Sequence, residues 1–152
     1  MKKKSLKKSI VICASASAYR GVLAVEQELK ALGFAVEVPS TAERMRASGD
    51  FRVETYKTWF KNPKDFSKKA WLMRNHFRKV KKSDATLVVN KPKNGIKGYI
   101  GGAVLTEMAI AFDRRKPIYV LHPVSKKLPV FEEVMGFQPI FLNGNIKKIK
   151  RT

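Results

Sequence analysis

The sequence predicts a single α/β domain in which helices cover both faces of a parallel sheet. Two observations support this prediction. Short apolar runs rich in β-branched residues alternate along the chain with stretches of helical periodicity. Residues 84–122 also contain a strand, a glycine-rich loop, a helix and a second strand in succession. This is the pattern of a βαβ unit, whose crossover connection is expected to be right-handed.

The first part of the chain is predicted to hold two strands joined by a helix. The strands are expected at residues 9–14 and 34–38, and Pro39 ends the second one. The helix between them has an apolar stripe formed by Val22, Val25, Leu29 and Leu32. Residues 41–62 are less regular. There we expect a loop and a short helix, with Tyr56, Trp59 and Phe60 packed against other elements.

A long helix is predicted over residues 65–82. Its apolar contacts are expected to be Phe66, Trp71, Leu72, Phe77 and Val80. Residues 57–82 contain ten Lys and Arg residues against one acid, Asp65. Basic residues interleaved with aromatic ones can bind single-stranded nucleic acid through phosphate contacts and base stacking. The alternative is a solvated helix face whose aromatic side chains are buried.

The central unit combines the features that suggest a functional site. We expect a buried strand at residues 85–89, a helix from about residue 103 to 116, and another strand at 118–121. Glu107 is the one carboxylate in this otherwise apolar helix and lies near its N-terminal end. The helix dipole is therefore expected to keep Glu107 ionised.

A short helix at residues 130–135 and a fifth strand at 139–142 complete the predicted elements. Together they indicate a three-layer sandwich with a five-stranded parallel sheet, flavodoxin- or Rossmann-like, in strand order 2-1-3-4-5. Such a sheet binds ligands at the carboxyl ends of its first and third strands. Candidate binding residues follow these strands in the sequence: Ser15, Ser17, Asn90, Gly101 and Gly102.

The length and composition of the chain limit the number of domains and the classes of protein to which it can belong. The 152 residues are expected to form one domain at 9–145, with a basic tail at 1–8 and a basic end at 146–152. The single cysteine, Cys13, fits a cytoplasmic protein and is most simply a small buried apolar residue. No apolar run has the length of a membrane span, and no zinc-ligand spacing is present, so we expect no membrane, metal or cofactor.

Three segments together resemble the nucleoside 2-deoxyribosyltransferase family, which includes the deoxynucleoside-5′-monophosphate N-glycosidases. They are CASASAYR at 13–20, SDATLVVN at 83–90 and YIGGAVLTEMAIA at 99–111, and the resemblance extends over about residues 9–145. It implies that Glu107 is the nucleophile that attacks the anomeric carbon and that Ser15 helps to hold substrate. It also implies a dimer or higher homo-oligomer. Tyr99 is a candidate contact for the sugar or the base.

His76 is the main departure from the family pattern, which has an Asp at this position to assist the departing base. A histidine can still donate a proton to the base, since its unperturbed pKa is about 6.5. His76 can equally be an exposed helix residue without a role. The expected activity is therefore N-glycosidase or deoxyribosyltransferase. The alternatives are a nucleotide-binding or sensing module with reduced catalysis, or a basic protein associated with nucleic acid.

The net charge of +20 favours anionic partners. The turn containing Ser15 and Ser17 leads into a helix, and Arg20 follows one turn later. Backbone N–H groups, hydroxyls and a guanidinium in this arrangement would suit a phosphate. A tight turn without a ligand is the plainer interpretation of the same residues. We expect 5′-phosphorylated ligands to bind better than the corresponding nucleosides.

Overall fold

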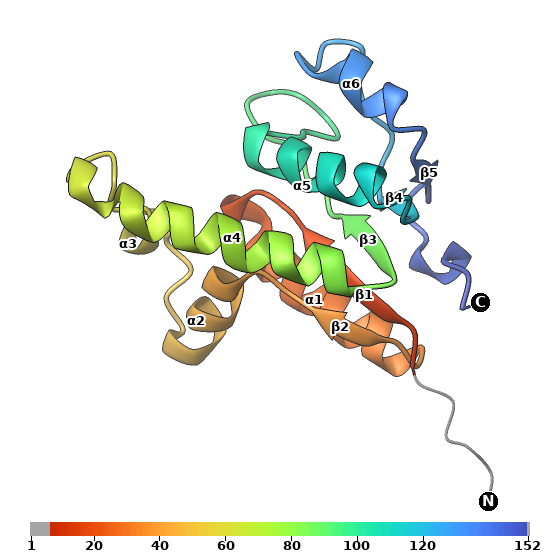
Figure 1. Cartoon of the computed structure of the whole chain (residues 1–152), viewed down its shortest axis with the longest axis horizontal. Helices are drawn as coiled ribbons and strands as arrows, with labels where there is room; N and C mark the ends of the chain where they lie inside the picture. The colour runs from red at the N-terminus through yellow and green to blue at the C-terminus, as the bar shows by residue number, and fades with distance from the viewer. Residues whose placement is uncertain (1–6, 152) are drawn as a thin grey trace, which may run out of the picture.

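The computed structural model describes residues 7–151, and most of the expected basic tail lies outside this range. Five parallel strands form one sheet in the order β2-β1-β3-β4-β5 (Figure 1). They are β1 (Ser9–Cys13), β2 (Ala35–Glu37), β3 (Ala85–Val88), β4 (Ile118–Val120) and β5 (Ile140–Phe141). The predicted fold class and strand order are confirmed, although each strand is shorter than its apolar run in the sequence.

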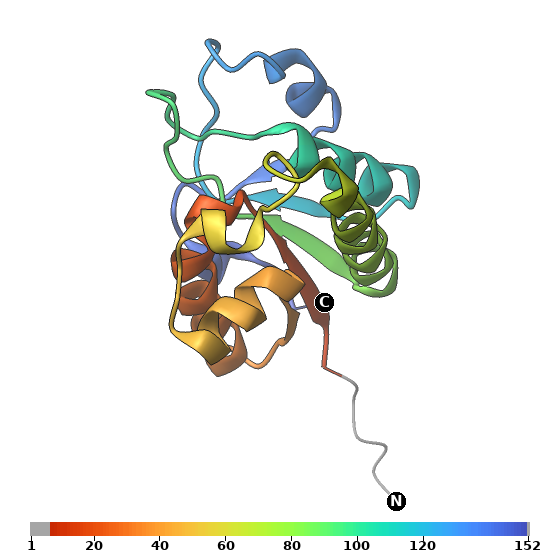
Figure 2. The ribbon, with the colours of Figure 1, turned by 90° about the vertical axis from the view of Figure 1, so that its left-hand side faces the viewer.

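Helices lie on both faces of the sheet (Figure 2). The α-helices are α1 (Tyr19–Ala31), α2 (Ser40–Ser48), α3 (Val53–Tyr56), α4 (Phe66–Lys82), α5 (Gly102–Asp113) and α6 (Phe131–Gly136). Short 3-10 turns are η1 (Ala16–Ala18), η2 (Pro63–Asp65) and η3 (Ile146–Lys148). Residues of α1, α2 and η3 pack on one face, and residues of α4, α5 and α6 pack on the other.

Strand β1 contributes to both layers of the core because successive side chains of a strand point to opposite faces. Ile10 and Ile12 pack with the residues of α1. Val11 and Cys13 pack with those of α4 and α5. All four side chains are fully buried. The carboxyl end of β1 therefore delivers Cys13 to the layer that contains Glu107.

Helix α4 uses a narrower apolar face than the sequence suggested. Val80 is fully buried, as expected, but Phe66 and Trp71 are 50% and 56% exposed. Both were expected to be buried contacts, and this prediction is wrong. Residues at helical spacing from Val80, including His76, define the inward face, and neither aromatic lies on it.

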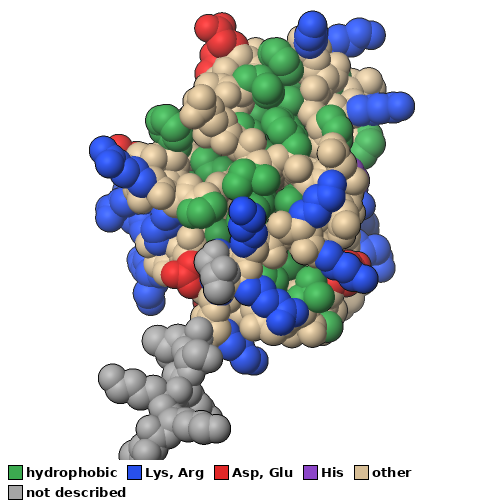
Figure 3. All heavy atoms as spheres, turned by 90° about the vertical axis from the view of Figure 1, so that its right-hand side faces the viewer, with side chains coloured by type: hydrophobic (Ala, Val, Ile, Leu, Met, Phe, Trp, Pro, Cys, Tyr) green, Lys and Arg blue, Asp and Glu red, His purple; other side chains and the backbone are tan. Residues whose placement is uncertain are grey.

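Residues 41–62 and the C-terminal end also differ in detail from what the sequence predicted. Trp59 is buried, but its neighbour Phe60 is exposed, so the expectation for Phe60 is wrong. At the other end the core continues beyond residue 145, since Ile146 and Ile149 are buried in the layer of α1. On the face that Figure 3 shows, Lys and Arg side chains are dispersed around exposed hydrophobic side chains. None of the helices described is both long enough and apolar enough to cross a membrane.

Candidate active site

A cavity of about 240 Å³ lies beyond the carboxyl end of β1, between residues of helices from both layers. Its wall is formed by the turn after β1, by segments of α2, α3 and α4, and by the loop that leads into α5. The cavity is close to the lower limit for small-molecule sites, which is about 300 Å³. Its position agrees with the expected ligand site of this sheet order.

Six of the predicted site residues line the cavity: Ser15, His76, Tyr99, Gly101, Gly102 and Glu107. Gly101 lies against two of the others. A Cβ atom placed on it would be 3.4 Å from the Tyr99 ring and 3.9 Å from Ser15 Oγ. The absence of a side chain at Gly101 therefore keeps the space between Ser15 and Tyr99 open.

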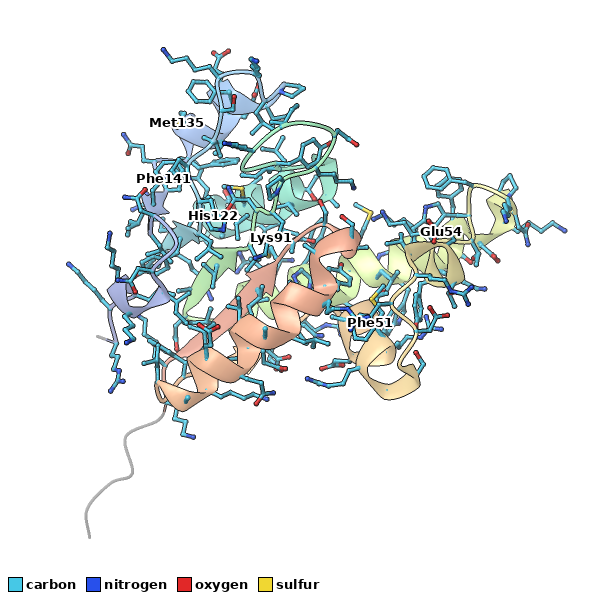
Figure 4. The ribbon with its side chains drawn as sticks, turned by 180° about the vertical axis from the view of Figure 1, so that it is seen from behind. Phe51, Glu54, Lys91, His122, Met135 and Phe141 are labelled. Atoms are coloured by element: carbon cyan, nitrogen blue, oxygen red, sulfur yellow. The ribbon has the colours of Figure 1, made fainter. Side chains whose placement is uncertain are left out.

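Ser17 and Arg20 lie outside the cavity, although the sequence grouped them with Ser15. Both are exposed. The Arg20 guanidinium stacks on the ring of Phe51, with its Cζ atom 4.1 Å from the ring centroid. Figure 4 shows Phe51 in the loop between α2 and α3. The expected phosphate site at this turn therefore loses two of its three proposed side-chain contacts.

Asn90 is buried and joins the ends of β3 and β4. Its Nδ2 donates to the carbonyl of His122 at 2.8 Å, and its Oδ1 accepts from the His122 backbone N–H at 2.9 Å. Figure 4 labels His122 next to Lys91, the residue after Asn90. The amide has no place in the cavity wall. Asn90 therefore connects two strands, and the structure gives it no position from which to contact a ligand in this cavity.

Glu107 is the only carboxylate among the described residues that line the cavity. It is the sixth residue of α5, beyond the first helical turn, and only 14% of its side chain is exposed. Burial raises the pKa of Glu107 from 4.5 to about 7, against smaller opposing effects of Cys13 and Lys69. Desolvation therefore opposes the ionisation of Glu107 that was expected from its place near the N-terminal end of the helix.

His76 lies beside Glu107 and is not an exposed helix residue. Its side chain is 7% exposed, and its Nε2 is 3.7 Å from Glu107 Oε2 and 3.4 Å from Cys13 Sγ. Burial, assisted by the charge of Lys79, lowers the pKa of His76 from 6.5 to about 4. Burial therefore favours the neutral imidazole, which argues against His76 as a cationic proton donor.

Three lysines that the sequence analysis did not select also line the cavity: Lys57, Lys69 and Lys93. Burial lowers the pKa of Lys57, and the charges of Lys69 and Lys93 lower it further. In the described part of the chain none of the three forms a salt bridge. The sequence signal for these lysines was the excess of positive charge in residues 57–82, but this excess could not indicate which lysines line the cavity.

Tyr19 and Cys13 are two further neighbours of Glu107 that were not predicted as site residues. Tyr19 lines the cavity, and its pKa is raised by burial and by the charge of Glu107. Cys13 is fully buried, and burial raises its pKa well above the usual value, with Glu107 adding to the effect. The site thus places a thiol, an imidazole, a phenol and a carboxyl group close together.

Comparisons with known proteins find a similarity in structure and no match in sequence. No protein-family model matches the chain, and no curated protein matches it in sequence. A similar solved structure belongs to a 2-deoxyribosyltransferase from the psychrotolerant bacterium Bacillus psychrosaccharolyticus. The two chains are 17% identical, with a TM-score of 0.47 over 80% of this chain and 77% of the other.

Proposed function

We propose that the protein cleaves the N-glycosidic bond of a nucleoside or nucleoside 5′-monophosphate, with Glu107 as the nucleophile. The observation that supports this most directly is the position of Glu107. It is the one described carboxylate in the cavity wall, and it lies in the helix that begins at Gly102, directly after Gly101. The resemblance of residues 99–111 to the family's glycine-then-Glu helix adds to this argument.

The reaction follows from one buried carboxylate facing an enclosed space. In its ionised form Glu107 attacks C1′ of the sugar, the C1′–N bond breaks, and the base departs with the bonding electron pair. Water or an acceptor nucleoside then attacks C1′, and the Glu107 carboxylate is released. A sugar cation-like transition state is stabilised by a carboxylate on one face of the ring.

In this proposal His76 is a positioning residue. Its neutral imidazole lies 3.7 Å from Glu107 Oε2, where it restricts the carboxyl group without competing for a proton at pH 7. Lys57 lines the same cavity and is a candidate to donate a proton to the departing base. Its lowered pKa makes it a stronger acid than an ordinary lysine.

We further propose that the substrate carries a 5′-phosphate that Lys69 and Lys93 bind. Both line the cavity, their charges act on Lys57, and neither forms a salt bridge in the described chain. A phosphate would neutralise this concentration of charge. The Ser15 hydroxyl lies in the same cavity and offers one more hydrogen bond.

The activity is tested by incubating the full-length protein with deoxynucleosides, ribonucleosides and their 5′-monophosphates and measuring free base by chromatography. We expect base release by the wild-type protein and a loss of roughly a thousandfold or more in Glu107→Gln. The matched control is Glu132→Gln, at an exposed acid of α6, which should retain full activity. An active Glu107→Gln protein would remove Glu107 from the mechanism, and ligand binding without base release would favour a sensing module.

The phosphate preference is tested by comparing the affinities of a nucleoside and its monophosphate in about 0.3 M salt, where the distant field is largely screened. Each charge-assisted contact is worth about 1.5–3 kcal/mol, so losing one should reduce the preference about ten- to hundredfold. We expect this loss in Lys69→Gln but not in the control Lys82→Gln, which removes an exposed lysine outside the cavity. Equal affinities for both ligands would refute the phosphate site.

We also propose that two or more copies assemble through the aromatic side chains near the start of α4. Phe60, Phe66 and Trp71 are exposed there, and a second copy of the chain would cover them. Light scattering should therefore give a mass well above the 17.2 kDa of one chain. A value near the mass of one chain at micromolar concentration would contradict this proposal.

A further inference from the structure

Three potential metal ligands from distant parts of the chain meet at the base of the cavity. Cys13 comes from the end of β1, His76 from α4 and Glu107 from α5. Their ligand atoms all lie within 4.8 Å of one another. We propose that these side chains form a three-ligand site for Zn²⁺ that is open toward the cavity.

An unpaired polar atom in this cluster supports the proposal. Glu107 Oε2 is buried and has no hydrogen-bond partner among the described residues. The distance of 3.7 Å from His76 Nε2 to Glu107 Oε2 is too long for a hydrogen bond. A buried carboxylate oxygen without a partner is costly, and a bound ion is one of the standard explanations for such an atom.

Two of the three ligand pairs have separations close to those of tetrahedral zinc. Bond lengths of about 2.3 Å to sulfur and about 2.0–2.2 Å to nitrogen and oxygen require S···N near 3.6 Å and N···O near 3.4 Å. The observed separations are 3.4 Å for Cys13 Sγ to His76 Nε2 and 3.7 Å for His76 Nε2 to Glu107 Oε2. Shifts of a few tenths of an ångström would bring these two pairs to ideal values.

The donor set also selects the type of metal. A thiolate, an imidazole and a carboxylate suit Zn²⁺ or Co²⁺, whereas Mg²⁺ and Ca²⁺ require oxygen ligands. A thiolate and a carboxylate together neutralise one divalent cation, so the occupied site carries no net charge in its buried surroundings. The proton of His76 would then reside on Nδ1, which leaves Nε2 free to bind the metal.

Zinc sites with three protein ligands keep a fourth position for water or substrate. Here that position faces the cavity, because His76 and Glu107 line it while Cys13 lies fully buried behind them. Metal binding would also occupy the carboxylate that acts as nucleophile in the proposed function. Zinc is therefore expected to inhibit base release, and this consequence alone rests on the proposed function.

The composition of the chain allows a sharp test, since it contains one cysteine and two histidines. Full-length protein freed of metal with a chelator is titrated with Co²⁺ and then Zn²⁺. We expect one equivalent of Co²⁺ to produce a thiolate-to-metal absorption band and visible bands of tetrahedral intensity, which Zn²⁺ then removes. Cys13→Ala should lose the thiolate band and bind Zn²⁺ at least about tenfold more weakly.

His122→Gln is the matched control because it removes the only histidine outside the cluster. It should bind Co²⁺ and Zn²⁺ like the wild-type protein, whereas His76→Gln should not. Circular dichroism shows whether each variant is folded. Because Cys13→Ala and His76→Gln each remove one ligand, the test remains valid if one of these two variants does not fold. Co²⁺ binding without a thiolate band, or an equal loss in His122→Gln, would overturn the proposal. Failure of the glycosidase assay with intact metal binding would refute the proposed function alone.

Discussion

Replacing Asn90 by Ala distinguishes a structural role of this residue from a role in binding ligand. The substitution removes both hydrogen bonds to His122, at 2.8 and 2.9 Å, and Asn90 itself is only 1% exposed. Each neutral hydrogen bond is worth about 1–1.5 kcal/mol, so the expected loss of unfolding free energy is about 2–3 kcal/mol. For a domain of this size the melting temperature should fall by roughly 5–10 °C.

The assay is urea unfolding followed by circular dichroism, with the midpoint and slope measured for each variant. Asn90→Asp is the informative companion. It keeps the acceptor for the His122 N–H but turns an oxygen toward the His122 carbonyl, so it should be destabilised at least as much as Asn90→Ala. A loss below about 0.5 kcal/mol in Asn90→Ala would refute the strand-connecting role. Weaker ligand binding by Asn90→Ala at unchanged stability would instead indicate that Asn90 contacts the ligand.

Two further predictions concern the backbone and acid stability. Gly98 has φ +67°, and a Cβ atom there would lie 2.1 Å from the carbonyl oxygen of Pro123, whereas Gly49 has φ +75° and open space around it. Urea unfolding should therefore show a loss of about 1–2 kcal/mol for Gly49→Ala and a clearly larger one for Gly98→Ala, and equal losses would contradict this explanation. A hydrogen bond from the backbone N–H of Ser9 is the main cause that lowers the pKa of Asp84. Asp84 therefore stabilises the fold fully above its unfolded pKa of about 3.9. This stabilisation is lost as the pH falls through the folded pKa. Asp84→Asn should accordingly make stability less dependent on pH below about pH 4, and an unchanged acid transition would count against it.

The strands and their order in the sheet could be predicted from the sequence because each sequence signal acts within a few residues of the chain. The β-branched run before Asn90, the glycines before Glu107 and the proline after the helix each restrict the backbone within a few residues. Together with the right-handed crossover rule, they leave few possible strand orders. The same local pattern placed Ser15, Gly101 and Glu107 near the carboxyl ends of the strands, where the cavity lies.

The cluster around Glu107 could not be predicted in the same way, because its members are far apart in the chain. Cys13 and His76 are separated by 63 positions, and their contact depends on how α4 rotates against the sheet. The same rotation exposes Trp71. Helical periodicity was a poor guide in α4, since basic residues surround an apolar face that is only a few residues wide.

The alternation of side chains along β1 limits how this site can be altered. Because Ile10 and Ile12 belong to the opposite layer, only Ser9, Val11 and Cys13 of this strand can project toward α4 and α5. A slip of one residue in the pairing with β3 would exchange the two sets and place an isoleucine beside Glu107. Any redesign of the cluster around Glu107 from this strand therefore has one usable position at the carboxyl end, and that position is already occupied by the thiol of Cys13.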